Sequence, residues 1–231
     1  MPHTALLAID VQSGLVVRRT QVYRAGELLA RIRALVARAH RAGAPVFFVR
    51  QVTKGALAMG SDGWQLHPGL RPAGSDIFIN KERASPFRQT RLLPELQKRG
   101  ITTTVIAGLA THQCIKSTCI DAKRLGFTVI LARDGHSSLN TNAARLIEHW
   151  NARLGSGTAR VVPARASGSE RSQTADGVSA SRAWPRPRPV ARVEQAWRRA
   201  PGTRPTTRAR GLRRERRLSG PPLESTRLPR V

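Results

Sequence analysis

The stretch Thr102–Leu125, TTTVIAGLATHQCIKSTCIDAKRL, decides how the rest of the chain is organised. Its first part, Thr103–Ala107, is β-branched and apolar, which predicts a strand buried on both faces of a parallel sheet. A tight turn follows at Gly108–Thr111, and we expect a helix to open near Gln113. Cys114 then lies in the first turn of that helix.

The position of Cys114 suggests a chemical role. The first turn of a helix has unpaired N–H groups and the positive end of the helix dipole, which favour an anion. A thiol there is expected to lose its proton more readily and to become a better nucleophile. The alternative is that Cys114 is a small buried hydrophobic residue, as free cysteines often are.

Strands and helices alternate along the chain around this stretch. Further strands are predicted at Ala5–Ile9, Pro45–Val49, Asp76–Asn80, Phe127–Ala132 and Thr158–Val162. Helices are predicted at Ala25–Ala42, Thr90–Arg99 and Thr141–Leu154. This alternation is typical of βαβ units, so we predict an α/β, three-layer, Rossmann-like fold with a six-stranded, mostly parallel sheet.

Three reactive side chains fall at or just past the ends of predicted strands: Asp10, Lys81 and Cys114. Ligands of open parallel sheets bind at the carboxyl ends of the strands, so we expect these groups to converge on one rim. Each residue alone is common at a surface, but the three together favour a catalytic site. The long connection 50–75 is expected to be functional or a lid.

The composition changes abruptly near residue 165. Residues 1–165 carry 24 Lys and Arg against nine acids, whereas residues 166–231 carry 16 Arg, no Lys and five acids. We therefore predict a domain at 1–165 and a disordered, low-complexity Arg/Pro-rich tail at 166–231. An out-of-frame reading of GC-rich coding sequence would give the same composition. A basic tail could also bind polyanions, in a salt-dependent manner.

The cysteines, the apolar segments and the N-terminal sequence indicate in which cellular compartment the protein is expected. Cys114 and Cys119 lie five residues apart on one predicted helix and point to different faces, so we expect no disulfide and a reduced protein. No apolar run reaches the roughly 20 residues needed to cross a bilayer. The N-terminal MPHTALLAID lacks the pattern of a secretion signal. We expect a cytoplasmic protein without a membrane partner.

Several motifs, taken in order, resemble one known family. ALLAIDVQ at 5–12, INKERASPF at 79–87 and VIAGLATHQC at 105–114 are similar to the isochorismatase-like cysteine hydrolases. That superfamily includes nicotinamidase, N-carbamoylsarcosine amidohydrolase and streptothricin hydrolase. The resemblance covers about residues 5–162, and the DGHSS stretch at 134–138 is closest to the streptothricin-hydrolase-like branch.

The resemblance implies an Asp10–Lys81–Cys114 triad that cleaves a small amide-like C–N bond through a covalent cysteine intermediate. It also implies a cis peptide bond between Leu109 and Ala110. The backbone N–H groups of Ala110 and Cys114 would then form an oxyanion hole. A homo-oligomer is implied as well, with a small amide-like molecule as substrate and nucleic acid bound, if at all, through the tail.

Substrate contacts are expected from four further residues: Gln12, Trp64, Phe87 and His112. Gln12 could instead orient the turn after Asp10, and the two aromatic residues could equally belong to the core. His112 stands where the family usually has an acidic residue. The Asp-x-His metal motif that nicotinamidases carry after the second strand is missing, so we predict no catalytic metal and no cofactor.

Two other functions remain open from the sequence. The family fold could carry isochorismate-type vinyl-ether hydrolysis, for which the cysteine is dispensable. The chain could also be a catalytically inactive α/β domain whose basic tail binds polyanions.

Overall fold

The computed structural model describes residues 3–16 and 22–164. The predicted tail at 166–231, and its expected disorder, lie outside these residues. Within them, no helix has the length and apolar character needed to cross a membrane.

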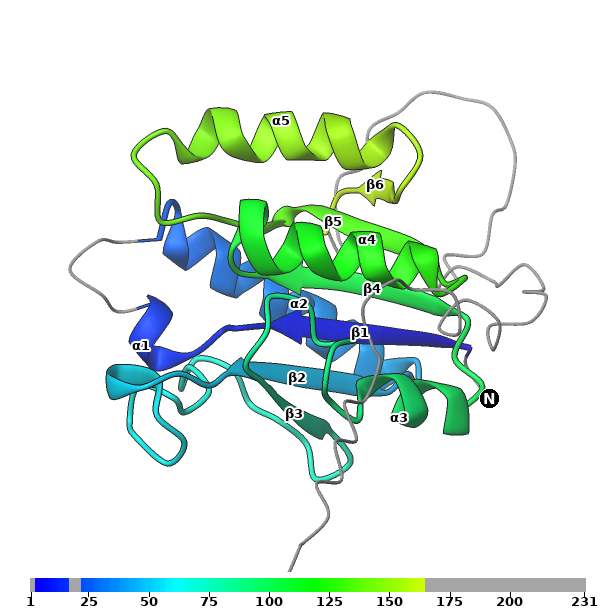
Figure 1. Cartoon of the computed structure of the whole chain (residues 1–231), viewed down its shortest axis with the longest axis horizontal. Helices are drawn as coiled ribbons and strands as arrows, with labels where there is room; N and C mark the ends of the chain where they lie inside the picture. The colour runs from blue at the N-terminus through cyan, green and yellow to red at the C-terminus, as the bar shows by residue number, and fades with distance from the viewer. Residues whose placement is uncertain (1–2, 17–21, 165–231) are drawn as a thin grey trace, which may run out of the picture. The chain divides into compact units, whose positions relative to one another are not determined.

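The described chain forms one six-stranded sheet in the order β3-β2-β1-β4-β5-β6 (Figure 1). The strands are β1 (Thr4–Ile9), β2 (Val46–Gln51), β3 (Ile77–Lys81), β4 (Thr103–Gly108), β5 (Thr128–His136) and β6 (Arg160–Val162). Every neighbouring pair is parallel, which confirms the predicted α/β sheet. β1 and β4 pair at the centre, and their buried, apolar sequences fit that place.

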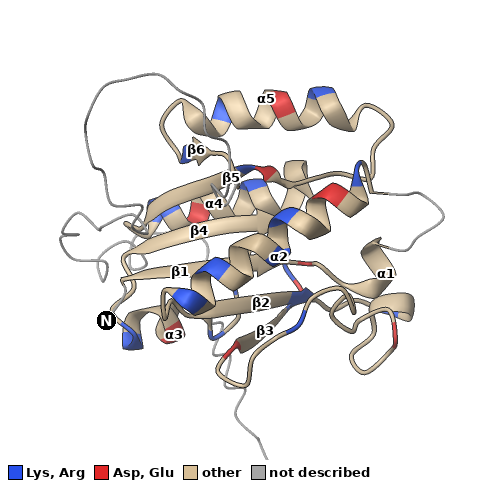
Figure 2. Ribbon diagram, turned by 180° about the vertical axis from the view of Figure 1, so that it is seen from behind, with Lys and Arg blue, Asp and Glu red and all other residues tan. Residues whose placement is uncertain are grey.

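Helices cover both faces of the sheet (Figure 1). The longer helices are α2 (Ala25–Arg41), α3 (Leu92–Lys98), α4 (Lys116–Arg124) and α5 (Ala143–Gly155). α2 packs on one face, while α3, α4 and α5 contribute to the core on the other. The charged positions of α2 are mostly basic, as Figure 2 shows.

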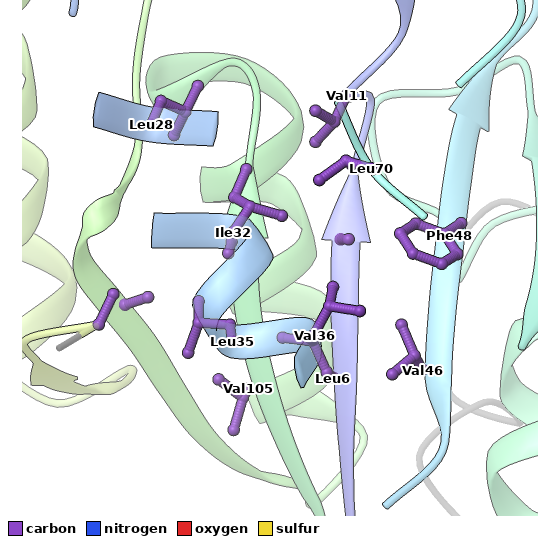
Figure 3. Packing of buried hydrophobic residues seen from close by; sticks show 14 of the residues in the cluster. Leu6, Val11, Leu28, Ile32, Leu35, Val36, Val46, Phe48, Leu70 and Val105 are labelled. Carbon is purple, nitrogen blue, oxygen red and sulfur yellow. The ribbon is translucent and has the colours of Figure 1, made fainter. Parts of the chain in front are cut away.

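The two cores follow from the alternation of side chains along each strand. Leu6 and Ala8 of β1 point to the α2 side, and Leu7 and Ile9 point to the opposite side. In α2 the apolar positions recur at helical spacing and face Val46, Phe48 and Val105 of the sheet (Figure 3). Full burial of each large side chain contributes about 2 kcal/mol.

Some local features differ from the sequence expectations. β5 continues to His136 because its register with β4 shifts between Ile106 and Gly108. Two short helices were not predicted: α1 (Ser13–Val16) and η1 (Gly55–Leu57). The 50–75 connection, expected to be functional or a lid, is tied to the chain after β1 by backbone hydrogen bonds. These include His67 N–H to the Val11 carbonyl, 2.9 Å.

Gly108 lets the tips of β1 and β4 approach closely. Its φ is +123°, and a Cβ there would lie 2.0 Å from the carbonyl oxygen of Ile9. The same oxygen accepts a hydrogen bond from Leu109 N–H at 2.9 Å. Only glycine fits this contact, which brings the residue after β1 next to the turn after β4.

We expect Gly108→Ala to lower the free energy of unfolding by about 3 kcal/mol, because it combines a strained φ with a backbone clash. Urea denaturation measures this. Gly26→Ala is the matched control: Gly26 is exposed in α2 with open space around its Cα, and alanine there should be neutral or stabilising by up to about 1 kcal/mol. Equal stability of Gly108→Ala and wild type would contradict this account of the turn.

Candidate active site

The three predicted reactive residues lie at or after the ends of three strands of the sheet. Asp10 directly follows β1 with a φ of +53°, Lys81 is the last residue of β3, and Cys114 follows β4. Because parallel strands end at the same edge, the three side chains meet there. We refer to Asp10, Lys81 and Cys114 as the triad.

The ammonium group of Lys81 joins the triad. Its Nζ lies 2.8 Å from Asp10 Oδ2 and donates to Cys114 Sγ at 3.3 Å. The Lys81 side chain is fully buried, and that of Asp10 is only 3% exposed. Charged groups this deep are stable only when paired and hydrogen-bonded, so the ion pair fixes both side chains in place.

A third acceptor of Lys81 was not predicted from the sequence. Gln51 Oε1 accepts from Lys81 Nζ at 2.5 Å. Gln51 is the last residue of β2, directly beside Lys81 in the parallel register. The prediction ended that strand at Val49, so the cross-strand partner of Lys81 was overlooked.

Cys114 is held by an unusual helical turn. Thr111–Ile115 (η2) form a π-helical turn that continues into α4, so the helix begins two residues earlier than expected. Thr118 Oγ1 donates to the carbonyl of Cys114 at 2.6 Å. The peptide bond between Leu109 and Ala110 is cis, as the resemblance implied. π-helical turns are frequent at functional sites.

The expected lowering of the Cys114 thiol pKa does not occur. Burial, followed by the negative charge of Asp10, raises the pKa of the Cys114 thiol to about 12, and the Lys81 charge offsets only part of this. The helix-start argument neglected both burial and the adjacent carboxylate. The resting cysteine is therefore a thiol that needs a base to become a nucleophile.

Asp10 has the properties of such a base. Burial raises the pKa of its carboxyl group, while Lys81 pulls the pKa in the opposite direction. One oxygen, Oδ2, is paired with Lys81, and the buried Oδ1 makes no hydrogen bond of normal geometry with the described residues. Asp10 and Cys114 both contact Lys81 Nζ, and the carboxylate raises the pKa of the thiol.

Residues 4–163 match the isochorismatase domain family. The chain belongs to the isochorismatase family. It is 33% identical to a streptothricin hydrolase of Streptomyces noursei over 142 residues, 61% of this chain and 51% of that protein. It is 31% identical to an uncharacterized isochorismatase family protein of Escherichia coli O157:H7, covering 58% of this chain and 80% of the relative. The chain thus spans about half the length of that streptothricin hydrolase.

Solved structures of the isochorismatase family have the same architecture. One isochorismatase family protein superposes with a TM-score of 0.67 at 33% identity, covering 70% of this chain and 99% of that one. An isochorismatase from Pseudomonas putida KT2440 gives a TM-score of 0.66 at 26% identity, covering 70% and 88%. These matches confirm the α/β fold and the family resemblance stated from the motifs.

Two of the four predicted substrate contacts are buried in this isochorismatase fold. Gln12 is fully buried, and its amide bonds to backbone: it donates to the carbonyls of Gln51 and Trp64 and accepts from Gln51 N–H. Phe87 is 3% exposed and packs against Phe127 at a ring distance of 5.8 Å. Both side chains thus make contacts within the fold, Gln12 to backbone and Phe87 to another ring.

The other two predicted contacts lie nearer the surface. Trp64 is half-buried, but the guanidinium of Arg50 covers its ring at 3.6 Å from the centroid. His112 is half-buried in the same turn as Cys114, and its Nδ1 lies 3.4 Å from Ser138 Oγ. Of the four residues, His112 is the one best placed to meet a ligand of Cys114.

His136, at the end of β5, supports the turn that carries Cys114. Its Nδ1 is 2.9 Å from Thr111 Oγ1, and its Nε2 is 3.0 Å from Asn151 Oδ1. Burial lowers the pKa of His136, so the neutral ring is favoured at neutral pH.

The cavity beside the triad is smaller than two cavities elsewhere in the protein. A cavity of about 190 Å³ beside Lys81 is lined in part by Val52, Met59, Glu82 and Arg83. Larger cavities of about 470 and 620 Å³ lie elsewhere, between α2 and α5 and at the opposite edge of the sheet. Among residues 3–16 and 22–164, no group of three or more His, Cys, Asp or Glu side chains could hold a metal ion.

The raised thiol pKa predicts an unusual pH dependence. Below its pKa a thiol gains about tenfold in thiolate per pH unit, so alkylation of Cys114 by iodoacetamide should keep rising from pH 7 to 10. Asp10→Asn removes a charge that raises the thiol pKa. The rise of alkylation with pH should therefore shift to lower pH in this variant, whatever the effect of losing the base on the rate itself.

Mass spectrometry of the labelled peptide follows this reaction. Asp76→Asn is the matched control, because Asp76 precedes β3 at the opposite edge of the sheet and bonds to His40. The Asp76→Asn variant should be alkylated at Cys114 at the wild-type rate. An alkylation profile of Asp10→Asn that rises over the same pH range as that of wild type would show that the carboxylate does not act on the thiol as described.

Proposed function

We propose that this isochorismatase-family protein is a hydrolase that cleaves a small amide-like C–N bond through a covalent intermediate on Cys114. The observation that carries the proposal is the shared ammonium group: Lys81 Nζ contacts Asp10 Oδ2 at 2.8 Å and Cys114 Sγ at 3.3 Å. This arrangement joins a nucleophile, a base and a fixed positive charge in one buried cluster.

The first half of the reaction forms the intermediate. Asp10 takes the proton of the Cys114 thiol, and the sulfur attacks the amide carbon. The carbonyl oxygen becomes negative, and we assign the backbone N–H groups of Ala110 and Cys114 to stabilise it. Asp10 then returns the proton to the leaving nitrogen, the C–N bond breaks and a thioester remains.

The second half of the reaction hydrolyses the thioester and restores the free Cys114 thiol. Water attacks the thioester carbon while Asp10 accepts the water proton. The C–S bond then breaks, and Asp10 passes this proton to the departing sulfur, which gives the acid, the thiol and the free carboxylate. The positive charge of Lys81 favours the thiolate over the thiol. The raised pKa of Asp10 makes it a stronger base than an exposed carboxylate, which suits its role in both steps.

The names of several relatives support the C–N bond as target. Besides streptothricin hydrolase, they include a maleamate amidohydrolase of Pseudomonas putida, 36% identical over 65 residues. Another is a ureidoacrylate amidohydrolase of Methylobacterium radiotolerans, 29% identical over 174 residues. A small amide, ureide or lactam is therefore the substrate class to test first.

We expect Cys114→Ala to lower hydrolysis of an active amide, ureide or lactam by at least about 10³-fold, because the nucleophile is lost. A panel of such compounds, assayed for released amine, measures this. Cys119→Ala is the matched control: Cys119 is fully buried in the core of the same helix and should retain the rate.

The covalent intermediate gives a second readout. Mass spectrometry of wild-type protein quenched during turnover should find the acyl group on Cys114 and not on Cys119. Full activity of Cys114→Ala would contradict the proposal. If the retained activity were towards an enol ether, the vinyl-ether reaction would replace C–N hydrolysis as the function.

A further inference from the structure

The ammonium group of Lys81 has three N–H donors and three acceptors. Asp10 Oδ2 and Cys114 Sγ account for two of them, and the proposed chemistry explains their presence. The third is the side-chain carbonyl of Gln51, at 2.5 Å, which that chemistry does not require. The proposed reaction therefore leaves the role of this neutral acceptor unexplained.

The orientation of the Gln51 amide is fixed by its other hydrogen bonds. Its Nε2 donates to the carbonyls of Val52 and Glu82, each at 3.1 Å. The opposite assignment would aim two N–H donors at Lys81 and a carbonyl at two carbonyls, so it is excluded. Oε1 therefore faces the ammonium group.

The backbone of Gln51 is held equally firmly. Gln51 N–H donates to Gln12 Oε1 at 2.8 Å, and Gln12 Nε2 donates to the Gln51 carbonyl at 3.0 Å. The register of β2 and β3 sets Gln51 directly beside Lys81. Gln12, buried after β1, thus links the strand that carries Asp10 to the residue that contacts Lys81.

We propose that Gln51 is a positioning residue of the active site: its carbonyl takes one N–H of Lys81, so that the other two are directed at Asp10 and Cys114. The inference rests on the proposed role of Cys114 as nucleophile. A lysine with a free third N–H could rotate about its last bond and lose its aim at the sulfur. Fixed donors act on a developing charge without reorganisation.

The adjacent rung of the same two strands offers a matched control. Arg50 and Asn80 pair in the register, and Arg50 Nε donates to Asn80 Oδ1 at 3.2 Å. The Arg50 side chain packs over Trp64 and Phe78, on the other face of the sheet. Asn80→Ala therefore removes a side-chain tie between β2 and β3 without altering any partner of Lys81.

The test is the rate of Cys114 alkylation by iodoacetamide in full-length wild type, Gln51→Met, Gln51→Glu and Asn80→Ala, from pH 7 to 10. Gln51→Met keeps the length but removes the acceptor, and the rate should fall about threefold to tenfold. Gln51→Glu keeps an oxygen but adds a negative charge that disfavours the thiolate, and the rate should fall about tenfold or more. Asn80→Ala should match wild type.

Thermal unfolding of each variant separates positioning from stability. If Gln51 only ties the strands together, its variants will unfold at lower temperature yet alkylate at the wild-type rate, which would overturn the inference. If Gln51→Met does not fold, Gln51→Leu gives the same test, because it also removes the acceptor of Lys81 without adding a charge. A wild type that hydrolyses no C–N substrate while the alkylation rates shift as expected would refute the proposed function and leave Gln51 as positioning residue.

Discussion

The buried ammonium group of Lys81 is the constraint on which the site depends. A charged amine with no exposed side-chain surface must have acceptors for its N–H groups, since an unpaired charge inside a protein costs several kcal/mol. Here the acceptors are Asp10, Gln51 and Cys114. Because these residues come from β1, β2 and the turn after β4, one side chain ties together four neighbouring strand ends, including its own.

The parallel sheet makes this arrangement possible. All strands end at one edge, and the close approach of Gly108 to Ile9 brings the base and the nucleophile to the same point. Burial has a chemical consequence as well, because it raises the pKa of both the carboxyl group and the thiol. In the proposed reaction, Cys114 is therefore activated by proton transfer to the neighbouring Asp10 and not by a permanently ionised sulfur.

The sequence predicted the strands, their parallel pairing and the convergence of the triad, because burial patterns and strand ends are local signals. It did not reveal Gln51, whose role arises from its register with Lys81 on the next strand. It could not separate a core aromatic residue such as Phe87 from a pocket wall, since both are apolar residues near a strand end. The thiol pKa was misjudged because burial depends on the whole fold.

The most direct test of the central claim is the NMR signal of the lysine side-chain ammonium groups at neutral pH. Lys81 should give a distinct cross-peak whose protons exchange slowly with water, because all three are buried and hydrogen-bonded. The peak should vanish in Lys81→Arg and shift when Cys114 is alkylated. A Lys81 ammonium group that exchanges as fast as those of surface lysines, and is unaffected by alkylation, would contradict the account.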